Sequence, residues 1–131
     1  MGQLLTREEF KKQTFMRTSS RCCVPNCSCD AVDAHHIMDR KLFSDGGYYL
    51  SNGAALCAKH HMDAETGKIT PAYLITVNKI NTDEIIQPDT IDLTREDYLE
   101  LLLSGELNKW GELTEKKDYD EDWFCQFHKK V

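Results

Sequence analysis

The chain lacks any long hydrophobic run. No stretch of its 131 residues approaches the roughly 18 consecutive apolar residues of a membrane span. The first residues, MGQLLTREEFKK, also lack the apolar segment of a secretory signal and carry acidic residues early. We therefore expect a cytoplasmic protein that has no membrane partner.

Cysteine, by contrast, is plentiful, with six in the chain. The cytosol keeps thiols reduced, so cysteines there indicate metal ligands rather than disulfides. The alternative is a small secreted protein held together by disulfides, which also explains an even number of cysteines. Histidines that follow cysteines at Cys-x2-His spacing favour the metal.

An excess of basic residues is also missing, because the net charge is −6. Residues 1–70 contain nine Lys/Arg and eight Asp/Glu, whereas residues 71–131 contain seven and fourteen. A polyanion can approach the first half and is repelled by the second. We predict a core with an N-terminal helix over 1–70. An acidic, mostly helical extension over 71–131 packs on or beside it and offers a surface to a protein partner.

Local patterns predict short helices and strands, and therefore an α+β fold. Thr6 and Glu9 form a capping-box pattern at the start of the first helix. Gly105 is a typical helix stop. The expected elements are a helix over 6–16, strands over 31–37 and 48–50, a turn over 51–53, a helix from 54 or 56 to about 65, a helix or buried strand over 71–80, and a helix over 94–103.

Metal ligands are concentrated between residues 22 and 65, which contain five of the six cysteines and four of the five histidines. Two ligand pairs occur there, Cys22-x4-Cys27 and Cys57-x2-His60. Four ligands with this spacing suit a tetrahedral structural zinc ion, which would stabilise a short ββα unit with little core of its own.

Some alternatives for this zinc site remain open. Cys23 or Cys29 can replace Cys22 or Cys27 without changing the type of site. A further Cys-x2-His pair, Cys125 and His128, has no second pair nearby, and we interpret its spacing as a coincidence.

Around these ligands the sequence resembles the HNH, or ββα-metal, endonuclease family. The resemblance covers roughly residues 20–66 and rests on Ala34-His35-His36-Ile37, on Asn52, and on Leu56-Cys57-x2-His60-His61. It implies a small zinc-stabilised ββα-metal core with flanking helices. It also implies a metal-dependent endonuclease that hydrolyses phosphodiester bonds, most readily of DNA, with Mg²⁺ or another divalent cation besides the structural zinc.

The resemblance also implies a role for each matching residue. His36 is the general base, because a neutral imidazole can take a proton from water at physiological pH. His35 and His61 are ligands of the catalytic cation, and Asn52 fixes the loop and orients the catalytic strand. Glu65, four residues after His61 on the same helical face, is our own addition to this ligand set.

Two further expectations concern geometry and substrate contacts. Strand alternation places His35 and His36 on opposite faces, so a shared site requires a local twist or bend. The basic residues expected to contact phosphates are Arg21, Arg40, Lys41 and Lys59.

Two other functions compete with the nuclease. One is a zinc-stabilised module that binds nucleic acid or protein without cutting, although such a module has no need of both His36 and His61. The other is an accessory subunit of a larger nuclease complex, whose acidic tail docks onto that enzyme or masks the active site.

Overall fold

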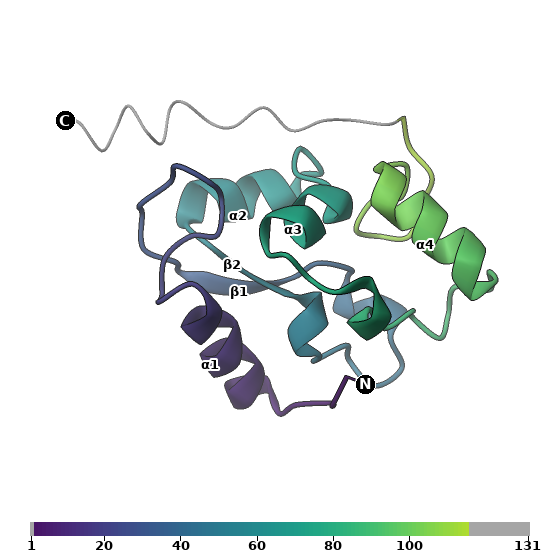
Figure 1. The fold of residues 1–131 in the computed structure, drawn as a ribbon, viewed down its shortest axis with the longest axis horizontal. Helices are drawn as coiled ribbons and strands as arrows, with labels where there is room; N and C mark the ends of the chain where they lie inside the picture. The colour runs from purple at the N-terminus through teal and green to yellow at the C-terminus, as the bar shows by residue number, and fades with distance from the viewer. Residues whose placement is uncertain (1, 116–131) are drawn as a thin grey trace.

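The computed structural model describes residues 2–115 and has a small α+β fold (Figure 1). In this part of the chain, four α-helices surround one two-stranded antiparallel sheet. The elements are α1 (Arg7–Arg17), β1 (Asp33–His36), β2 (Gly53–Leu56), α2 (Ala58–Glu65), α3 (Pro71–Val77) and α4 (Arg95–Ser104), with 3₁₀ helices at Arg40–Leu42, Leu50–Asn52 and Thr82–Glu84. Across residues 2–115, no helix has both the length and the apolar character needed to cross a membrane.

The helices lie on the two sides of the sheet. Helix α1 packs against both strands from one side and α2 contacts them from the other, while α3 packs against α4 (Figure 1). Arg17, at the end of α1, donates hydrogen bonds to the backbone carbonyls of Leu50 and Gly53. These bonds fix the helix beside the start of β2.

The helix predictions at both ends of the described chain are confirmed to within one residue. The Thr6 hydroxyl accepts a hydrogen bond from the backbone N–H of Glu9 at 3.1 Å and caps α1. Helix α4 ends at Gly105, whose φ of 86° lies in the left-handed region that favours glycine. The segment over 71–80 forms a helix rather than a strand, since Thr70 caps α3.

The prediction of the second strand was wrong. The chain is not a strand over 48–50 and does not turn over 51–53; it forms a 3₁₀ helix at Leu50–Asn52 and then enters β2. Every residue of β2 is buried, so its sequence, Gly-Ala-Ala-Leu, shows no alternation of polar and apolar residues. Helix α2 consequently begins only at Ala58.

Small residues in β2 let α1 approach the sheet closely. The register pairs His36 with Gly53 and His35 with Ala54. A Cβ atom at Gly53 would collide with the Thr14 hydroxyl and would lie only 3.0 Å from the Phe10 ring. Glycine is therefore required where α1 crosses β2.

One hydrophobic core joins both halves of the described chain. It includes Ile37, Leu56, Leu74, Tyr98, Leu102 and Leu107. The segment after α4 returns to the sheet, because the Asp39 backbone N–H donates to the Lys109 carbonyl at 2.8 Å. The division of the chain at residue 70 stays a prediction. The Cys125–His128 pair and the rest of the predicted extension beyond residue 115 lie outside the described residues.

Candidate metal centre and catalytic cluster

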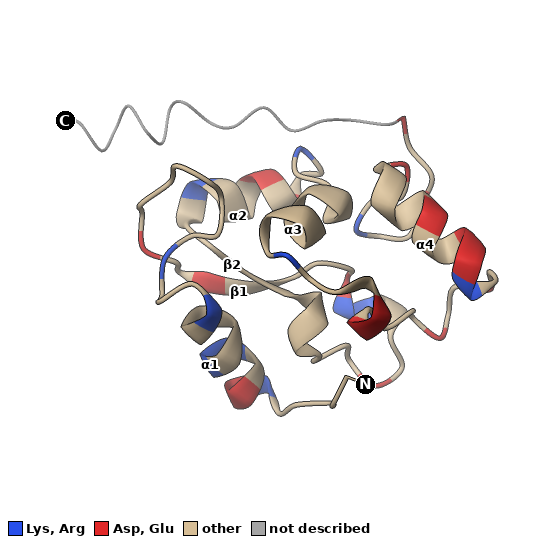
Figure 2. Ribbon diagram, in the orientation of Figure 1, with Lys and Arg blue, Asp and Glu red and all other residues tan. Residues whose placement is uncertain are grey.

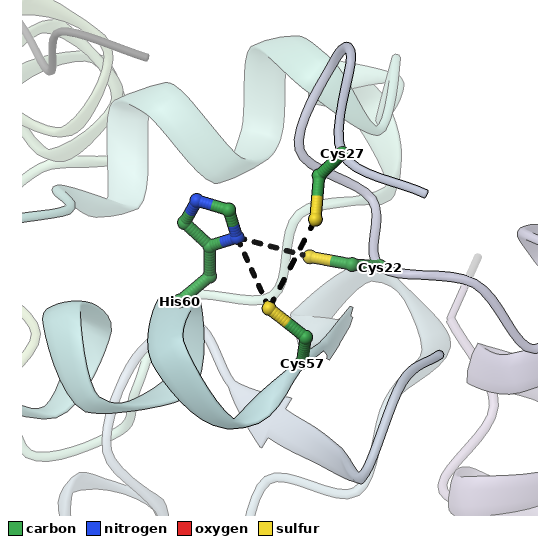
Figure 3. Close-up of side chains that lie close together, drawn as sticks. All are labelled: Cys22, Cys27, Cys57 and His60. Atoms are coloured by element: carbon green, nitrogen blue, oxygen red, sulfur yellow. Dashed lines mark hydrogen bonds between the residues drawn. The ribbon is translucent and has the colours of Figure 1, made fainter. Parts of the chain in front are cut away.

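Four side chains that can bind a metal converge beside the start of α2. Cys22 and Cys27 come from the loop over 21–30, and Cys57 and His60 come from the start of α2 (Figure 3). Their ligand atoms all lie within 4.8 Å of one another. We call this group the four-ligand cluster.

Backbone hydrogen bonds hold the loop over 21–30 in place. The Cys27 N–H donates to the Val24 carbonyl at 3.1 Å, and Asn26 takes up a left-handed φ of 67° within this turn. The Cys23 N–H donates to the Ala55 carbonyl at 2.9 Å, which attaches the loop to β2. The chain therefore makes a tight turn between Cys22 and Cys27, the first two ligands.

The distances within the four-ligand cluster suit zinc. His60 Nδ1 lies 3.4 Å from Cys22 Sγ and 3.2 Å from Cys57 Sγ, and the sulfurs of Cys27 and Cys57 are 4.0 Å apart. Tetrahedral zinc with the usual bond lengths places its ligand atoms roughly 3.5–3.8 Å apart. These four residues therefore sit close enough to bind a metal such as zinc.

The thiols in this cluster have unequal pKa values. A shared hydrogen bond raises the pKa of Cys22 and lowers the pKa of Cys57 to about 3, and His60 also stabilises the Cys57 thiolate. Two thiolates so close together repel each other unless a cation lies between them. A zinc ion supplies that cation and allows both sulfurs to ionise.

The alternative ligands, Cys23 and Cys29, are not part of this cluster. The Asn78 amide donates a hydrogen bond to Cys23 Sγ at 3.4 Å, and burial raises the pKa of the Cys23 thiol. None of the five described cysteines forms a disulfide. Residues 2–115 are therefore not the disulfide scaffold considered above.

A second group of possible metal ligands comes from β1 and α2. It consists of His35, His61 and Glu65, and we call it the three-ligand cluster. Glu65 Oε2 lies 3.1 Å from His35 Nδ1 and 3.5 Å from His61 Nε2. Helical spacing brings His61 and Glu65 together, and β1 presents His35 to them. Three such ligands suit a divalent cation that keeps positions open for substrate.

The protonation states of this cluster also suit a cation. Burial lowers the pKa of His35 to about 3, and the charge of Lys109 acts in the same direction. Burial alone would raise the pKa of Glu65, but the hydrogen bond and charge of Lys109 outweigh it, so the pKa is lowered. A neutral imidazole and an ionised carboxylate are the forms that bind metals.

Sequence reasoning missed Lys109 and Asp33. Lys109 Nζ lies 2.8 Å from Glu65 Oε2, and its side chain is almost fully buried. Asp33 Oδ2 lies 3.2 Å from His61 Nε2. Lys109 follows Glu65 by 44 residues and belongs to the acidic half, so no local pattern could have identified it.

His36, the predicted general base, lies against α1. Its ring stacks on Phe10 with centroids 4.7 Å apart and meets the Tyr48 ring edge-on at 4.9 Å. Burial lowers the pKa of His36, and the Arg40 guanidinium lowers it further. Its Nε2 atom is buried, and no atom of the described chain hydrogen-bonds to it. A neutral ring with an unpartnered nitrogen suits a proton acceptor.

His36 and the three-ligand cluster share one cavity of about 190 Å³. Its lining residues include His35, His36, His61, Glu65, Arg40 and Lys109. Alternation does direct His35 toward α2 and His36 toward α1, as predicted. Both histidines nevertheless line the cavity.

Asn52 fixes the loop that follows β1. Its Oδ1 accepts from the Met38 N–H at 2.9 Å, and its Nδ2 donates to the carbonyls of Met38 and Gly47 at 3.0 and 3.2 Å. The side chain is buried and does not line the cavity. Its contacts are those of a residue that positions the loop, not of one that touches substrate.

The predicted phosphate contacts divide into two pairs. Arg40 and Lys41 line the cavity that contains His36. Arg21 lies 3.7 Å from Asp30 beside the loop over 21–30, and Lys59 donates to Asp63 at 2.8 and 2.9 Å. The structure thus brings only the first pair to the cavity.

Comparison of the chain with protein-family models, with curated proteins and with solved structures finds no match.

Proposed function

We propose that this protein is a metal-dependent endonuclease of the HNH, or ββα-metal, type that hydrolyses phosphodiester bonds of DNA. The observation that carries the proposal is that His36 and the three-ligand cluster line one cavity, which the four-ligand cluster does not line. A module that only holds nucleic acid needs one structural ion. It has no use for a histidine such as His36, which lines a cavity beside a second set of ligands.

The proposed roles follow from the chemistry of phosphodiester hydrolysis. His36 accepts a proton from the attacking water, and its lowered pKa keeps it neutral near pH 7. A divalent cation such as Mg²⁺ held by His35, His61 and Glu65 would neutralise charge on the phosphate and on the leaving oxygen. Asn52 keeps the loop after His36 in position.

The basic residues at the cavity have a supporting role. Arg40 and Lys41 line the cavity, where they can contact a phosphate of the substrate. An arginine can bind two phosphate oxygens at once and so orient the scissile bond. The four-ligand cluster, with zinc bound, holds the loop over 21–30 to α2 and thereby supports the sheet that carries His36.

Nicking of supercoiled plasmid DNA by the zinc-loaded chain tests this proposal. The assay compares wild type with His36→Ala in Mg²⁺, in Mn²⁺ and in EDTA, with zinc content measured on each protein. We expect wild type to nick in Mg²⁺ or Mn²⁺ and the variant to lose activity by 100-fold or more, on the order expected for a general base. Both proteins should retain one zinc.

Three results would count against the proposal. Equal nicking by both proteins would show that His36 is not the base or that a contaminant is active. No nicking by zinc-loaded wild type, together with retained binding of DNA, would favour the module that binds without cutting. Nicking only after addition of a further protein would favour the accessory subunit.

A further inference from the structure

A hollow on the described surface runs along α1 and extends onto β1 and the loop that follows it. It has a volume of about 710 Å³. We call it the α1 groove. The residues that give it its character are Arg7, Lys11, Lys12, Phe15, Arg40 and Tyr48.

The charge of the α1 groove is opposite to that of the whole chain. Four basic side chains line it, against two acidic ones, Glu8 and Asp33. Asp33 is already engaged, since its carboxylate lies 3.2 Å from His61 Nε2. The net charge of the chain is −6, so the basic character of the groove differs from the average charge of the protein. Helix α4, rich in acidic residues, lies on the far side of the molecule (Figure 2).

The basic residues are arranged in a row. Arg7 and Lys11 are one helical turn apart, which is about 6 Å along the axis of α1. This spacing is similar to the distance between successive phosphates of one nucleic-acid strand. Phe15 continues the row by another turn, with Lys11 Nζ 5.6 Å from its ring centroid. A row of cations with an aromatic neighbour is typical of surfaces that follow a single strand.

The α1 groove is continuous with the proposed catalytic cavity. Asp33, Ala34, His36 and Arg40 line both. Phe10 and Tyr48 form a wall of the groove and also enclose the His36 ring. A strand that lies in the groove therefore reaches His36 without crossing the acidic side of the molecule.

We infer that the α1 groove binds the phosphate backbone of the DNA strand that is cut, with Arg7 and Lys11 contacting phosphates on one side of the scissile bond. That the bound strand is cut rests on the proposed nuclease function, whereas the binding of DNA by the α1 groove is a separate inference. Arg40, at the junction of groove and cavity, then contacts the strand nearest to the bond that breaks.

Binding of a fluorescent single-stranded DNA oligonucleotide to the zinc-loaded His36→Ala chain tests the inference, because this chain should not cut its ligand. The test variant adds Arg7→Glu and Lys11→Glu. The matched control adds Lys68→Glu and Lys79→Glu, which make the same change in charge at exposed sites outside the groove. A glutamate at Arg7 falls in the first turn of α1, where acidic residues favour the helix, so folding should be kept.

We expect the groove variant to bind at least tenfold more weakly and the control to change less than twofold. The slope of log affinity against log salt should fall by roughly 1.4 in the groove variant, the value for two lost phosphate contacts on a single strand. Equal weakening in both variants would show that only net charge matters and would overturn the inference. Absence of binding before any groove substitution would also overturn it.

The same charge reversals, made in a chain that retains His36, distinguish this inference from the proposed function. If the groove variant still cleaves DNA and its affinity for the oligonucleotide is unchanged, the nuclease proposal stands and the groove inference is wrong. If binding depends on the groove residues but no chain cleaves DNA, the groove inference stands and the nuclease proposal is wrong. A duplex of the same sequence, bound more tightly than the single strand and equally by both variants, would place the DNA elsewhere on the surface.

Discussion

The protonation state of His36 is set by groups on several sides of its ring. Burial against Phe10 and Tyr48 and the positive charge of Arg40 lower its pKa, while Asp39 and a hydrogen bond to the Gly46 backbone act in the opposite direction. The effects that lower the pKa of His36 outweigh those that raise it. The imidazole therefore stays neutral at pH values where an exposed histidine begins to gain a proton.

Arg40→Gln should shift the acid limb of the kcat profile to higher pH. Removing the guanidinium removes an effect that lowers the pKa of His36, so the base becomes protonated at a higher pH. The loss of kcat relative to wild type should be several-fold greater at pH 5.5 than at pH 8. The matched control is Lys41→Gln, a neighbour that also lines the cavity. The same shift in the control would point to substrate binding instead of His36.

Lys109 is a cation that already contacts a proposed metal ligand. Its ammonium lies 2.8 Å from Glu65 Oε2 and 4.0 Å from Asp39 Oδ2. A divalent ion at the three-ligand cluster must approach the same carboxylate. Lys109 and the ion therefore repel each other across Glu65.

Lys109→Met should strengthen binding of Mn²⁺ to the zinc-loaded chain by about tenfold, which is about 1.4 kcal/mol. The effect is modest because Glu65 is half exposed, and water screens its interactions. Lys68→Met, an exposed change, should leave the affinity unaltered. Isothermal titration calorimetry measures both. Weaker binding in Lys109→Met would show that the lysine positions Glu65 for the ion.

At the scale of elements, the four-ligand cluster joins the loop over 21–30 to the start of α2. The loop has one backbone bond from Cys23 to β2, and the helix has only eight residues. Structural zinc in small domains contributes an apparent 10–16 kcal/mol, which is comparable to or larger than the whole stability of a typical domain, about 5–15 kcal/mol.

Cys57→Ser should therefore lose zinc and unfold the sheet region at 25 °C. Cys23→Ser is the matched control, because Cys23 lies in the same loop and outside the cluster. The control should keep one zinc and a cooperative transition in urea. Zinc content and circular dichroism measure both outcomes. A Cys57→Ser chain that keeps its fold without metal would show that the zinc is not structural.

The contact between α1 and β2 depends on the missing side chain of Gly53. A methyl group there would overlap the Thr14 hydroxyl and press on Phe10. Gly53→Ala should therefore lower the free energy of unfolding by about 1–3 kcal/mol, as overpacking does. Thr14→Ala should restore part of this loss in the double variant. Additive losses in urea unfolding would show that the two residues do not meet.

The sequence predicted some elements and sites better than others, for physical reasons. Helices α1 and α4 were predicted from caps that are local in sequence. The four-ligand cluster was predicted from its two closely spaced pairs. His35 and His61 were predicted from the resemblance to the HNH family, and Glu65 from its helical spacing to His61. Strand β2 was missed because it is buried on both faces and lacks alternation. Lys109 and the α1 groove arise from contacts between distant segments, which no local pattern records.

At the scale of the whole molecule, charge is separated in space. Residues 71–115 contain three basic and ten acidic residues, whereas residues 116–131 contain four of each. The acidic excess thus lies in residues 71–115. Part of it is on α4, across the molecule from α1 (Figure 2). Removal of residues 106–131 would also remove the buried Leu107 and Lys109. A chain that ends at residue 115 keeps both residues, but it tests masking only by residues 116–131, which carry no net charge.

The central claim is that the two metal clusters have different tasks in one small fold. The measurement that tests it most directly is a titration of Mn²⁺ into the zinc-loaded chain, followed by electron paramagnetic resonance, with plasmid nicking measured on the same samples. We expect one Mn²⁺ per zinc-loaded chain, a nicking rate that rises with its occupancy, and loss of both in His61→Ala with zinc retained. Nicking at full rate without bound Mn²⁺, or Mn²⁺ binding that survives in His61→Ala, would contradict the separation of a structural zinc from a catalytic cation.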